Sequence, residues 1–226
     1  MSSAEWNAIW LSIQVAFVGV LVSLPIGIAT GWLLARKRFF GKAVVETIVN
    51  LPLVLPPVVT GYLLLVTFGR SGFLGRILEN WFGLRFVFDW KGAALAAAVV
   101  SLPLMVRAIR VAFSSVDPKL EQAARTLGAS PLDTFFTVSL PLARHGVIAG
   151  CMLSFARSLG EFGATIMIAG SIPGETQTIP LYIFNQLQVP EGMNGARSIV
   201  LFSIAIAVVA LFAGERLDRR GVAGQA

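Results

Sequence analysis

The sequence predicts an all-α polytopic membrane protein, built as a single transmembrane domain over residues 1–226. Hydrophobic residues make up 56% of the chain and charged residues only 13%, whereas about 25% of residues are charged in an ordinary globular domain. The mean hydropathy is +0.78. Five apolar runs are long enough to cross a bilayer, which takes about 20 residues as a helix. We therefore expect five transmembrane helices, with six as the alternative.

The first two spans are predicted over Ile9–Ala35 and Ile48–Phe68. The first is a continuous apolar run that ends at a basic cluster, residues 36–38. The second contains three prolines, which lack backbone N–H groups and must kink any helix that contains them. These are Pro52, Pro56 and Pro57. Such kinks are tolerated where neighbouring protein hydrogen-bonds the freed carbonyls, so this span is expected to pack against other helices.

The remaining spans are predicted over Gly92–Phe113, Gly146–Gly170 and Ala196–Gly214. Between the second and third spans, Arg70–Trp90 is too charged to cross a bilayer and is expected to form an interfacial helix with aromatic anchors. If this segment did cross, it would be the sixth span. The basic loop at residues 36–42 would then lie outside the cell, against the positive-inside rule.

The basic residues at the ends of the spans predict the orientation. They are Arg36, Lys37, Arg38 and Lys42 in the first loop, and Arg216, Arg219 and Arg220 in the tail. With five spans both groups lie on one side of the membrane, which the positive-inside rule identifies as the cytoplasm. The N-terminus is then outside, and the C-terminus and the loop at 114–145 are cytoplasmic. This topology explains the net charge of +6 without a nucleic-acid partner.

Signatures of enzymes and metal sites are missing from the sequence. Cys151 and His145 are the only residues of their types, so no Cys pair or H-E-x-x-H motif is possible. Gly41-Lys42 is followed by Ala43, and no phosphate-binding loop surrounds it. We therefore expect no catalytic residue, no metal and no cofactor in this chain. If the protein uses ATP, another chain must hydrolyse it.

The segment 114–145 is unusual because it carries charges and helix-breaking residues between two apolar runs. Asp117 supplies an N-cap carboxylate, and Pro118 follows at the first helical position. A short, Ala-rich helix is expected from there to Gly128, which is a natural C-terminal stop. The small face of this helix favours docking of a partner over simple contact with lipid headgroups.

A second helix is predicted to begin immediately afterwards. Ser130 is its expected cap, Pro131 its first residue and Asp133 its third, a variant of the capping box. We expect Pro141 to disrupt this helix, because proline cannot donate the hydrogen bond that a helix interior needs. The segment is thus predicted to be two short helices at the inner membrane surface.

Arg157 and Glu161 are charged residues inside the fourth predicted span. Each charge costs about 2.5–3.5 kcal/mol at a bilayer centre, so such residues are candidates for a functional role. Four residues apart, they would share a helix face and neutralise each other in part. Gly160 belongs to a stripe of small residues that would let another helix approach closely. The pair either locks this helix into the bundle or lines and gates a pathway.

The stretch "LPLVLPPVVTGYLLL" in the second span allows the same two interpretations. Its prolines either produce only a packing kink or, as in transporters with broken helices, expose backbone groups to a solute. A pathway role is favoured because hydroxyls and a close backbone approach follow the prolines. The candidates are Pro56, Pro57, Thr60, Gly61 and Tyr62.

The segment "EQAARTLGASPLDTFFTVSLP" resembles the EAA loop, E-A-A-x3-G-x9-I-x-L-P, of permease subunits in bacterial and archaeal ABC importers. The small residues, the glycine and the Leu-Pro pair match this pattern. Two positions differ, since Gln122 replaces the glutamate, with Glu121 one residue earlier, and Val138 replaces the isoleucine. The resemblance implies that the following residues couple to an ATPase: Glu121, Gln122, Ala123, Ala124, Gly128, Ser130, Pro131, Leu140 and Pro141.

Within that superfamily the chain is similar to the molybdate permease branch, from about Trp10 to Gly214. The similarity is carried by the proline-rich stretch above, by "ARSLGEFGATIMIAG" and by "SIPGETQTIPLYIF". The branch implies a homodimer in the bilayer, two ATPase subunits that bind ATP and Mg²⁺, and an extracytoplasmic binding protein that delivers the oxyanion. A route for a tetrahedral dianion adds Ser154 and Ser158 to the pathway candidates, with Arg157 setting a positive potential.

Other functions remain open at the level of the sequence. A sulfate or tungstate importer would need the same geometry. A secondary transporter or channel independent of ATP would be expected to have inverted internal repeats, and none is visible. A membrane enzyme that uses Glu161 as acid or base is disfavoured, because no second catalytic group lies at a recognisable spacing.

Overall fold

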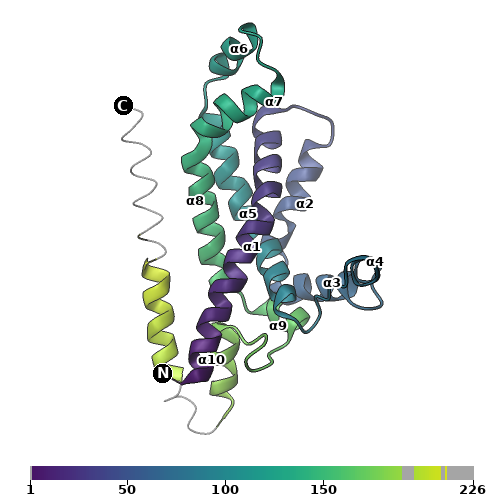
Figure 1. The fold of residues 1–226 in the computed structure, drawn as a ribbon, viewed down its shortest axis with the longest axis vertical. Coiled ribbons are helices and arrows are strands. Elements are labelled where there is room, and N and C mark those ends of the chain that lie inside the picture. The colour runs from purple at the N-terminus through teal and green to yellow at the C-terminus, as the bar shows by residue number, and fades with distance from the viewer. Residues whose placement is uncertain (1, 190–195, 210–211, 213–226) are drawn as a thin grey trace.

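The computed structural model describes residues 2–189, 196–209 and 212, and within this part of the chain every regular element is a helix. Three long helices form the centre: α1 (Ser3–Arg36), α5 (Trp90–Ser115) and α8 (Leu140–Leu159). They pack against one another, and α5 has extensive contacts with both of the others (Figure 1). The predicted all-α fold class is therefore confirmed.

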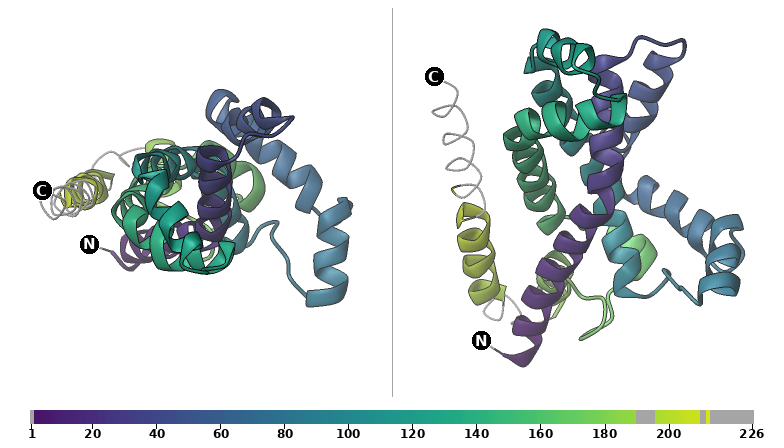
Figure 2. Two further views of the ribbon diagram at one scale, coloured as in Figure 1. Left: turned by 90° about the horizontal axis from the view of Figure 1, so that it is seen from above. Right: turned by 45° about the horizontal axis from the view of Figure 1, so that its top comes forward.

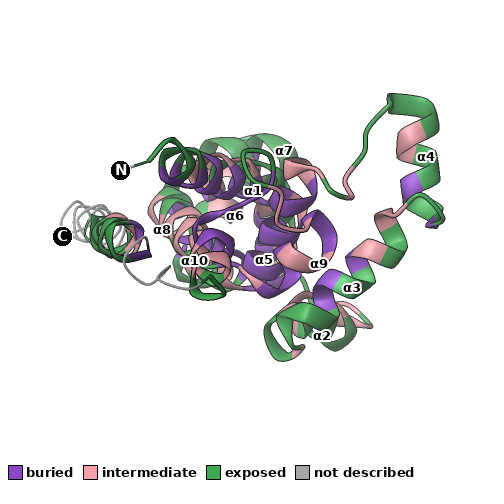
Figure 3. Cartoon of the chain, turned by 90° about the horizontal axis from the view of Figure 1, so that it is seen from below, coloured by how far each residue is buried: buried purple, intermediate pink, exposed green. Residues whose placement is uncertain are grey.

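The first third of α5 is rich in alanine, and this allows its neighbours to approach closely. Ala93, Ala96 and Ala97 are completely buried. A Cβ atom added to Gly19 of α1 would lie only 3.2 Å from the Ala94 carbonyl oxygen, so the two helix backbones are nearly in contact there. Close backbone approach through small residues is the usual way in which helices associate in lipid. Figure 3 shows α5 as a mostly buried element with more exposed helices around it.

The first and third predicted spans are confirmed as α1 and α5, each continuous through an internal proline. The second predicted span, Ile48–Phe68, is instead two helices, α2 (Lys42–Val54) and α3 (Pro57–Phe68), with a bend of 113° between them. Two consecutive prolines explain the break. Each lacks an N–H donor, and each disfavours the helical conformation of the residue before it.

The segment Arg70–Trp90, where the sequence predicts an interfacial helix, contains the helix α4 (Phe73–Phe82). It follows α3 and projects from the side of the bundle together with α2 and α3 (Figure 2). The side chain of Trp81 is 81% exposed, as expected of an aromatic anchor.

The fourth span was predicted over Gly146–Gly170 and differs at both ends. The helix is continuous from Pro131 to Leu159, and the chain then breaks before the short helix α9 (Gly163–Ala169). Pro141 does not disrupt this helix, contrary to the expectation from the sequence. Residues 135–139 form a π-helical turn, in which the Leu140 N–H bonds to the Phe135 carbonyl. The wider turn accommodates a proline ring that would clash with the carbonyl four residues earlier in an α-helix.

Two helices complete the described chain. The first, α10 (Ile179–Leu187), packs against α1 through a small cluster that includes Ile9 and Tyr182. The second, residues 196–209, is the described part of the predicted fifth span. Residues 210, 211, 213 and 214 of that span, and the basic tail, lie outside the described residues. Near the start of this helix, the Ser198 hydroxyl donates to the Glu5 carboxylate of α1 over 2.6 Å.

The segment 114–145 contains α6 (Pro118–Thr126) and α7 (Pro131–Thr134), which continues through the π-helical turn into α8. We call this segment the inner loop, because the sequence predicts that it is cytoplasmic. Both helices lie at the end of the bundle where α1 ends, opposite the N-terminus (Figure 1). The basic loop after α1 is therefore at the same end as α6. This agrees with the prediction that both lie on one side of the membrane.

Candidate functional site

The caps predicted for α6 are present. The Asp117 carboxylate accepts a hydrogen bond of 2.9 Å from the Lys119 backbone N–H. At the other end, Gly128 has φ +92°, a left-handed conformation that suits glycine and disfavours other residues. Its N–H bonds to the Arg125 carbonyl, and the next N–H bonds to the Ala124 carbonyl. The chain therefore turns sharply after α6 and enters α7 without an uncapped helix end.

The predicted capping box of α7 is also present. The Ser130 hydroxyl accepts from the Asp133 N–H over 3.2 Å, and the Asp133 carboxylate accepts from the Ser130 N–H over 3.2 Å. Since α7 runs without interruption into α8, the inner loop is joined by one continuous helix to the centre of the bundle.

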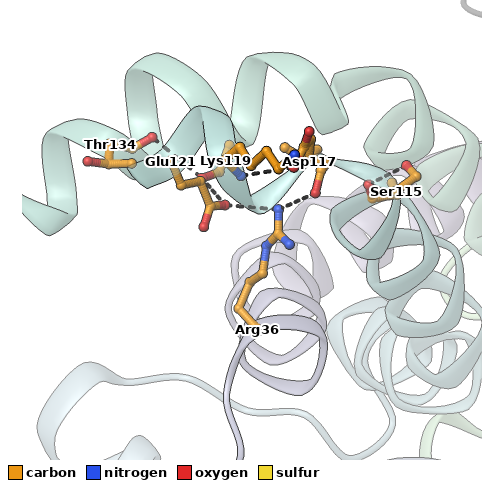
Figure 4. A network of polar contacts seen from close by, with 9 residues as sticks. Arg36, Ser115, Asp117, Lys119, Glu121 and Thr134 are labelled. Carbon is orange, nitrogen blue, oxygen red and sulfur yellow. Dashed lines mark hydrogen bonds and ion pairs between the residues drawn. The ribbon is translucent and has the colours of Figure 1, made fainter. Parts of the chain in front are cut away.

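Glu121 points inward, toward the end of α1 (Figure 4). Its carboxylate forms an ion pair of 3.1 Å with the Arg36 guanidinium, and the two side chains are only 15% and 12% exposed, respectively. It also accepts a hydrogen bond of 2.7 Å from the Ser139 hydroxyl. The same Arg36 group donates to the Val116 carbonyl at the end of α5 over 2.7 Å. Arg36 thus links α1, the end of α5 and α6, and we call this set of contacts the Arg36–Glu121 latch.

The opposite face of the loop is exposed and carries Lys119 together with uncharged side chains. Gln122 and Ala123 are exposed, whereas Ala124 is half-buried. Leu127 is 89% exposed and Leu132 is 71% exposed. Large apolar side chains in such positions indicate a surface that a partner covers.

The last two residues of the predicted loop motif divide between core and surface. Leu140 packs against the buried cluster formed by α1, α5 and α8, whereas Pro141 is exposed. In the same region Phe135 stacks on Phe113 with ring centroids 6.0 Å apart and meets Trp32 edge-on. The base of the loop is therefore held by aromatic packing in addition to the latch.

The two helix breaks meet in space, because α3 and α9 pack closely together. A Cβ atom added to Gly61 would lie 2.7 Å from the Ala164 Cα atom, and one added to Gly163 would lie 2.9 Å from the Pro57 Cβ atom. Only glycine fits at both positions. The predicted close approach at Gly61 is thus explained by its contact with α9.

Arg157 and Glu161 form an ion pair of 2.9 Å, but they do not share one helix face as the sequence suggested. The helix ends at Leu159, and Glu161 lies in the break, where its carboxylate accepts the Ala164 N–H over 2.9 Å. The Glu161 side chain is 2% exposed and that of Arg157 is 31% exposed. Glu161 therefore both neutralises Arg157 and caps the start of α9.

The other pathway candidates fall into two groups. Pro56, Pro57, Tyr62 and Gly160 are exposed. Gly160 also lines an apolar hollow of about 550 Å³ between the break and the helix at 196–209. A pathway role for these residues is compatible with their exposure.

The second group of candidates is buried. Ser154 of α8 is fully buried and its hydroxyl donates to the Ser101 hydroxyl of α5 over 2.7 Å. Ser158 is also buried at this contact and lies against the Ala97 carbonyl oxygen. Thr60 is 4% exposed, and its hydroxyl has no hydrogen-bond partner among the described residues. In this conformation the two serines connect α5 to α8.

Sequence reasoning missed several residues of these sites. Arg36 was used only to predict the orientation in the membrane, and neither Ser139 nor Ser101 was identified as a candidate. A charged residue at the end of an apolar run has no local signal for its partner, because Glu121 is far away in the chain. In the described part of the chain, no group of three His, Cys, Asp or Glu residues could hold a metal ion.

The sequence of the chain is similar to those of known transport proteins. The family described as "binding-protein-dependent transport system inner membrane component" matches residues 23–221. The molybdenum transport system permease protein ModB of Escherichia coli (strain K12) is 55% identical over 97% of this chain and 96% of its own length. A sulfate transport system permease protein, CysW of Synechocystis, is 32% identical over 95% of this chain and 77% of its own length.

Among solved structures, an inward-facing form of the MetNI methionine ABC transporter matches with a TM-score of 0.75 and 18% identity. The match covers 98% of this chain and 99% of that chain. This similarity supports the fold, and the sequence relatives establish the family. The chain belongs to the inner membrane components of binding-protein-dependent transport systems, the permease subunits of ABC importers.

Proposed function

We propose that this chain is the permease subunit of an ATP-driven molybdate importer and forms the translocation path as a homodimer. The observation that carries the proposal is the 55% identity to a molybdenum permease over nearly the whole of both chains. The identity to a sulfate permease is lower, at 32%, which favours molybdate over sulfate. Tungstate remains an alternative cargo, because its oxyanion has the same shape and charge.

The proposed partners are a second copy of the chain, two ATPase subunits that bind ATP and Mg²⁺, and an extracytoplasmic binding protein. The family description, which names dependence on a binding protein, supports the last of these. The chain is an inner membrane protein, and we infer that its N-terminus lies outside the cell. The C-terminus and the loop at 114–145 are then cytoplasmic, where an ATPase can reach the loop.

Coupling is assigned to the exposed face of α6 and α7, within a single permease domain over residues 1–226. The proposed ATPase contacts are Gln122, Ala123, Gly128 and Pro131, supported by the exposed Leu127 beside them. Glu121 has a different role, because its carboxylate is already engaged by Arg36 within the chain. It holds α6 on the end of α1 so that movement of the ATPase is transmitted to the bundle.

The pathway is assigned to the side of the bundle where the two helix breaks meet. Broken helices present backbone groups at the depth where a solute must pass, and weak polar contacts allow the solute to leave again. The exposed candidates at the breaks, Pro56, Tyr62 and Gly160, are proposed to line the route. The ion pair of Arg157 and Glu161 stabilises the second break.

The test is uptake by the permease reconstituted in proteoliposomes with its ATPase and binding protein. We expect ATP-dependent uptake of molybdate, with competition by tungstate stronger than competition by sulfate. Uptake that persists without the ATPase would indicate a secondary transporter or channel. Preferential uptake of sulfate would overturn the assignment of the cargo and leave the family unchanged.

A further inference from the structure

The helix α2 is attached to the rest of the chain mainly by polar contacts. It has no buried residue, and its close neighbour is α5. The Arg110 guanidinium forms an ion pair of 3.0 Å with Glu46, and the Arg107 Nε group donates to the Asn50 side-chain oxygen over 2.9 Å. These contacts place two arginines of α5 beside one face of α2.

That face of α2 is a polar stripe. Glu46, Thr47 and Asn50 follow one another at helical spacing, so they lie on the same side of the helix. Together with Arg107 and apolar neighbours they line an open hollow of about 530 Å³ between α2 and α5. A polar stripe of this kind is unfavourable against lipid and favourable against water or a polar solute.

The charges around the hollow do not balance. Glu46 is neutralised by Arg110, whereas Arg107 has only the neutral amide of Asn50. No carboxylate forms an ion pair with Arg107 in the described ranges. Counted together with Arg110, which pairs with Glu46, the groups around the hollow carry one net positive charge. A charge without an ionic partner is unfavourable against lipid, so the exposed Arg107 of this predicted spanning helix is expected to contact water or an anion.

The hollow lies along the expected direction of transport. Arg107 is eight residues before the end of α5, which corresponds to about 12 Å along the helix axis. Asn50 is five residues before the break at Leu55, or about 8 Å. The hollow is thus located between the helix breaks and the inner end of the bundle.

We propose that Arg107, together with Asn50 and Thr47, forms a transient binding site for the tetrahedral oxyanion in the inner half of the translocation path. The planar guanidinium offers paired N–H donors that match two oxygens of such an anion. Among the described residues only its Nε donor is used, by Asn50. A single positive charge per chain, with neutral groups around it, attracts a dianion without trapping it. This inference rests on the proposed function and adds residues to it.

The experiment compares variants of the complete complex in proteoliposomes with the loaded binding protein. Arg107→Gln is expected to lower the rate of molybdate uptake by about tenfold or more, as for the loss of charge-assisted hydrogen bonds. Arg107→Lys keeps the charge but not the paired donors and should give an intermediate rate. Arg76→Gln removes an exposed charge from α4 that has no ion pair within the described residues, and it serves as the matched control.

Copurification of the ATPase with each variant verifies assembly. If Arg107→Gln does not assemble, Asn50→Ala provides the measurement, with an expected decrease in uptake of severalfold. Equal uptake by Arg107→Gln and Arg76→Gln would overturn the site.

The same hollow could instead hold the phosphate of a lipid, and a second arm separates the two anions. In that case the defect of Arg107→Gln would disappear in vesicles of a lipid that has no phosphate group, and this result would also overturn the proposal. A wild-type complex that imports no oxyanion would refute the proposed function itself. If the wild-type complex imports molybdate and the Arg107→Gln variant imports it at the same rate, only the role of Arg107 is refuted.

Discussion

The Arg36–Glu121 latch is predicted to transmit movement between the inner loop and the bundle. The perturbation is Glu121→Gln, which preserves the shape of the side chain and removes its charge. At 3.1 Å the pair attracts with about 5 kcal/mol at an effective dielectric constant of 20, before the cost of desolvation. Removing one partner of a fully buried pair costs about 3–5 kcal/mol.

Two features of the structure adjust this magnitude. The side chains retain 12% and 15% exposure, and Arg36 keeps its bond to the Val116 carbonyl, so the cost is lower. However, the Arg36 Nε atom is buried without a partner among the described residues, which makes Arg36 depend more on Glu121. We expect a net loss of about 2 kcal/mol, or about 30-fold in the equilibrium between the docked and released loop.

The assay measures uptake and ATPase binding of the same reconstituted complex. Because Glu121 faces its own chain, Glu121→Gln should reduce molybdate uptake strongly while the ATPase still copurifies. Glu79→Gln is the matched control, since it makes the same substitution in the more exposed ion pair of Glu79 with Arg85, and it should leave uptake near that of the wild type. Exchange of the two charges in the double variant Arg36→Glu, Glu121→Arg should restore part of the uptake.

Two results would contradict the proposed role of the Arg36–Glu121 ion pair. Loss of the ATPase on copurification with Glu121→Gln would mean that this carboxylate contacts the ATPase directly. Normal uptake by Glu121→Gln, with unchanged thermal stability, would mean that the ion pair contributes nothing measurable, as is the case for many exposed pairs.

Three further variants test other parts of the structure. Gly128→Val forces a β-branched residue into φ +92°, which costs about 1–3 kcal/mol and should distort the turn between α6 and α7. ATP hydrolysis should then continue without uptake, and normal uptake would contradict a coupling role. Gly61→Ala places a methyl group 2.7 Å from the Ala164 Cα atom and should lower stability in thermal unfolding by about 1–3 kcal/mol. The control is Gly160→Ala, which should lower stability less, because the nearest atom to its methyl group is 3.9 Å away. Ser154→Ala leaves the buried Ser101 hydroxyl without its hydrogen-bond donor and should lower stability by about 1–3 kcal/mol. The double variant Ser101→Ala, Ser154→Ala should be more stable than Ser154→Ala, and equal stability of the two would contradict this account.

Helix caps and long apolar helices could be read from the sequence because their causes are local. The Asp117 and Ser130 caps involve backbone groups two or three residues away, so the residue types are sufficient to predict them. Gly128 likewise ends α6 through its own conformation. In the same way, continuous hydrophobicity predicted α1 and α5, since apolar side chains and satisfied backbone groups are what a bilayer requires of a helix.

Breaks and continuities at prolines and glycines were predicted less well. Two adjacent prolines produced a full break between α2 and α3 rather than a kink, whereas Pro141 produced no break at all. The difference depends on whether the chain can widen into a π-helical turn and still bury Phe135 against Phe113. The rule that proline ends a helix considers only the residue type and contains no information about that packing.

By itself, the sequence determined that the chain is helical and suited to a membrane, where its long helices run, and how its inner loop is capped. It also carried the motif that relates the chain to importer permeases. Only the tertiary structure decided that Glu121 meets Arg36, that the two helix breaks pack on each other, and that Arg107 faces a polar hollow. The reason is physical: local rules act over a few residues of one helix, whereas an ion pair or an interhelical contact depends on where separate helices are packed.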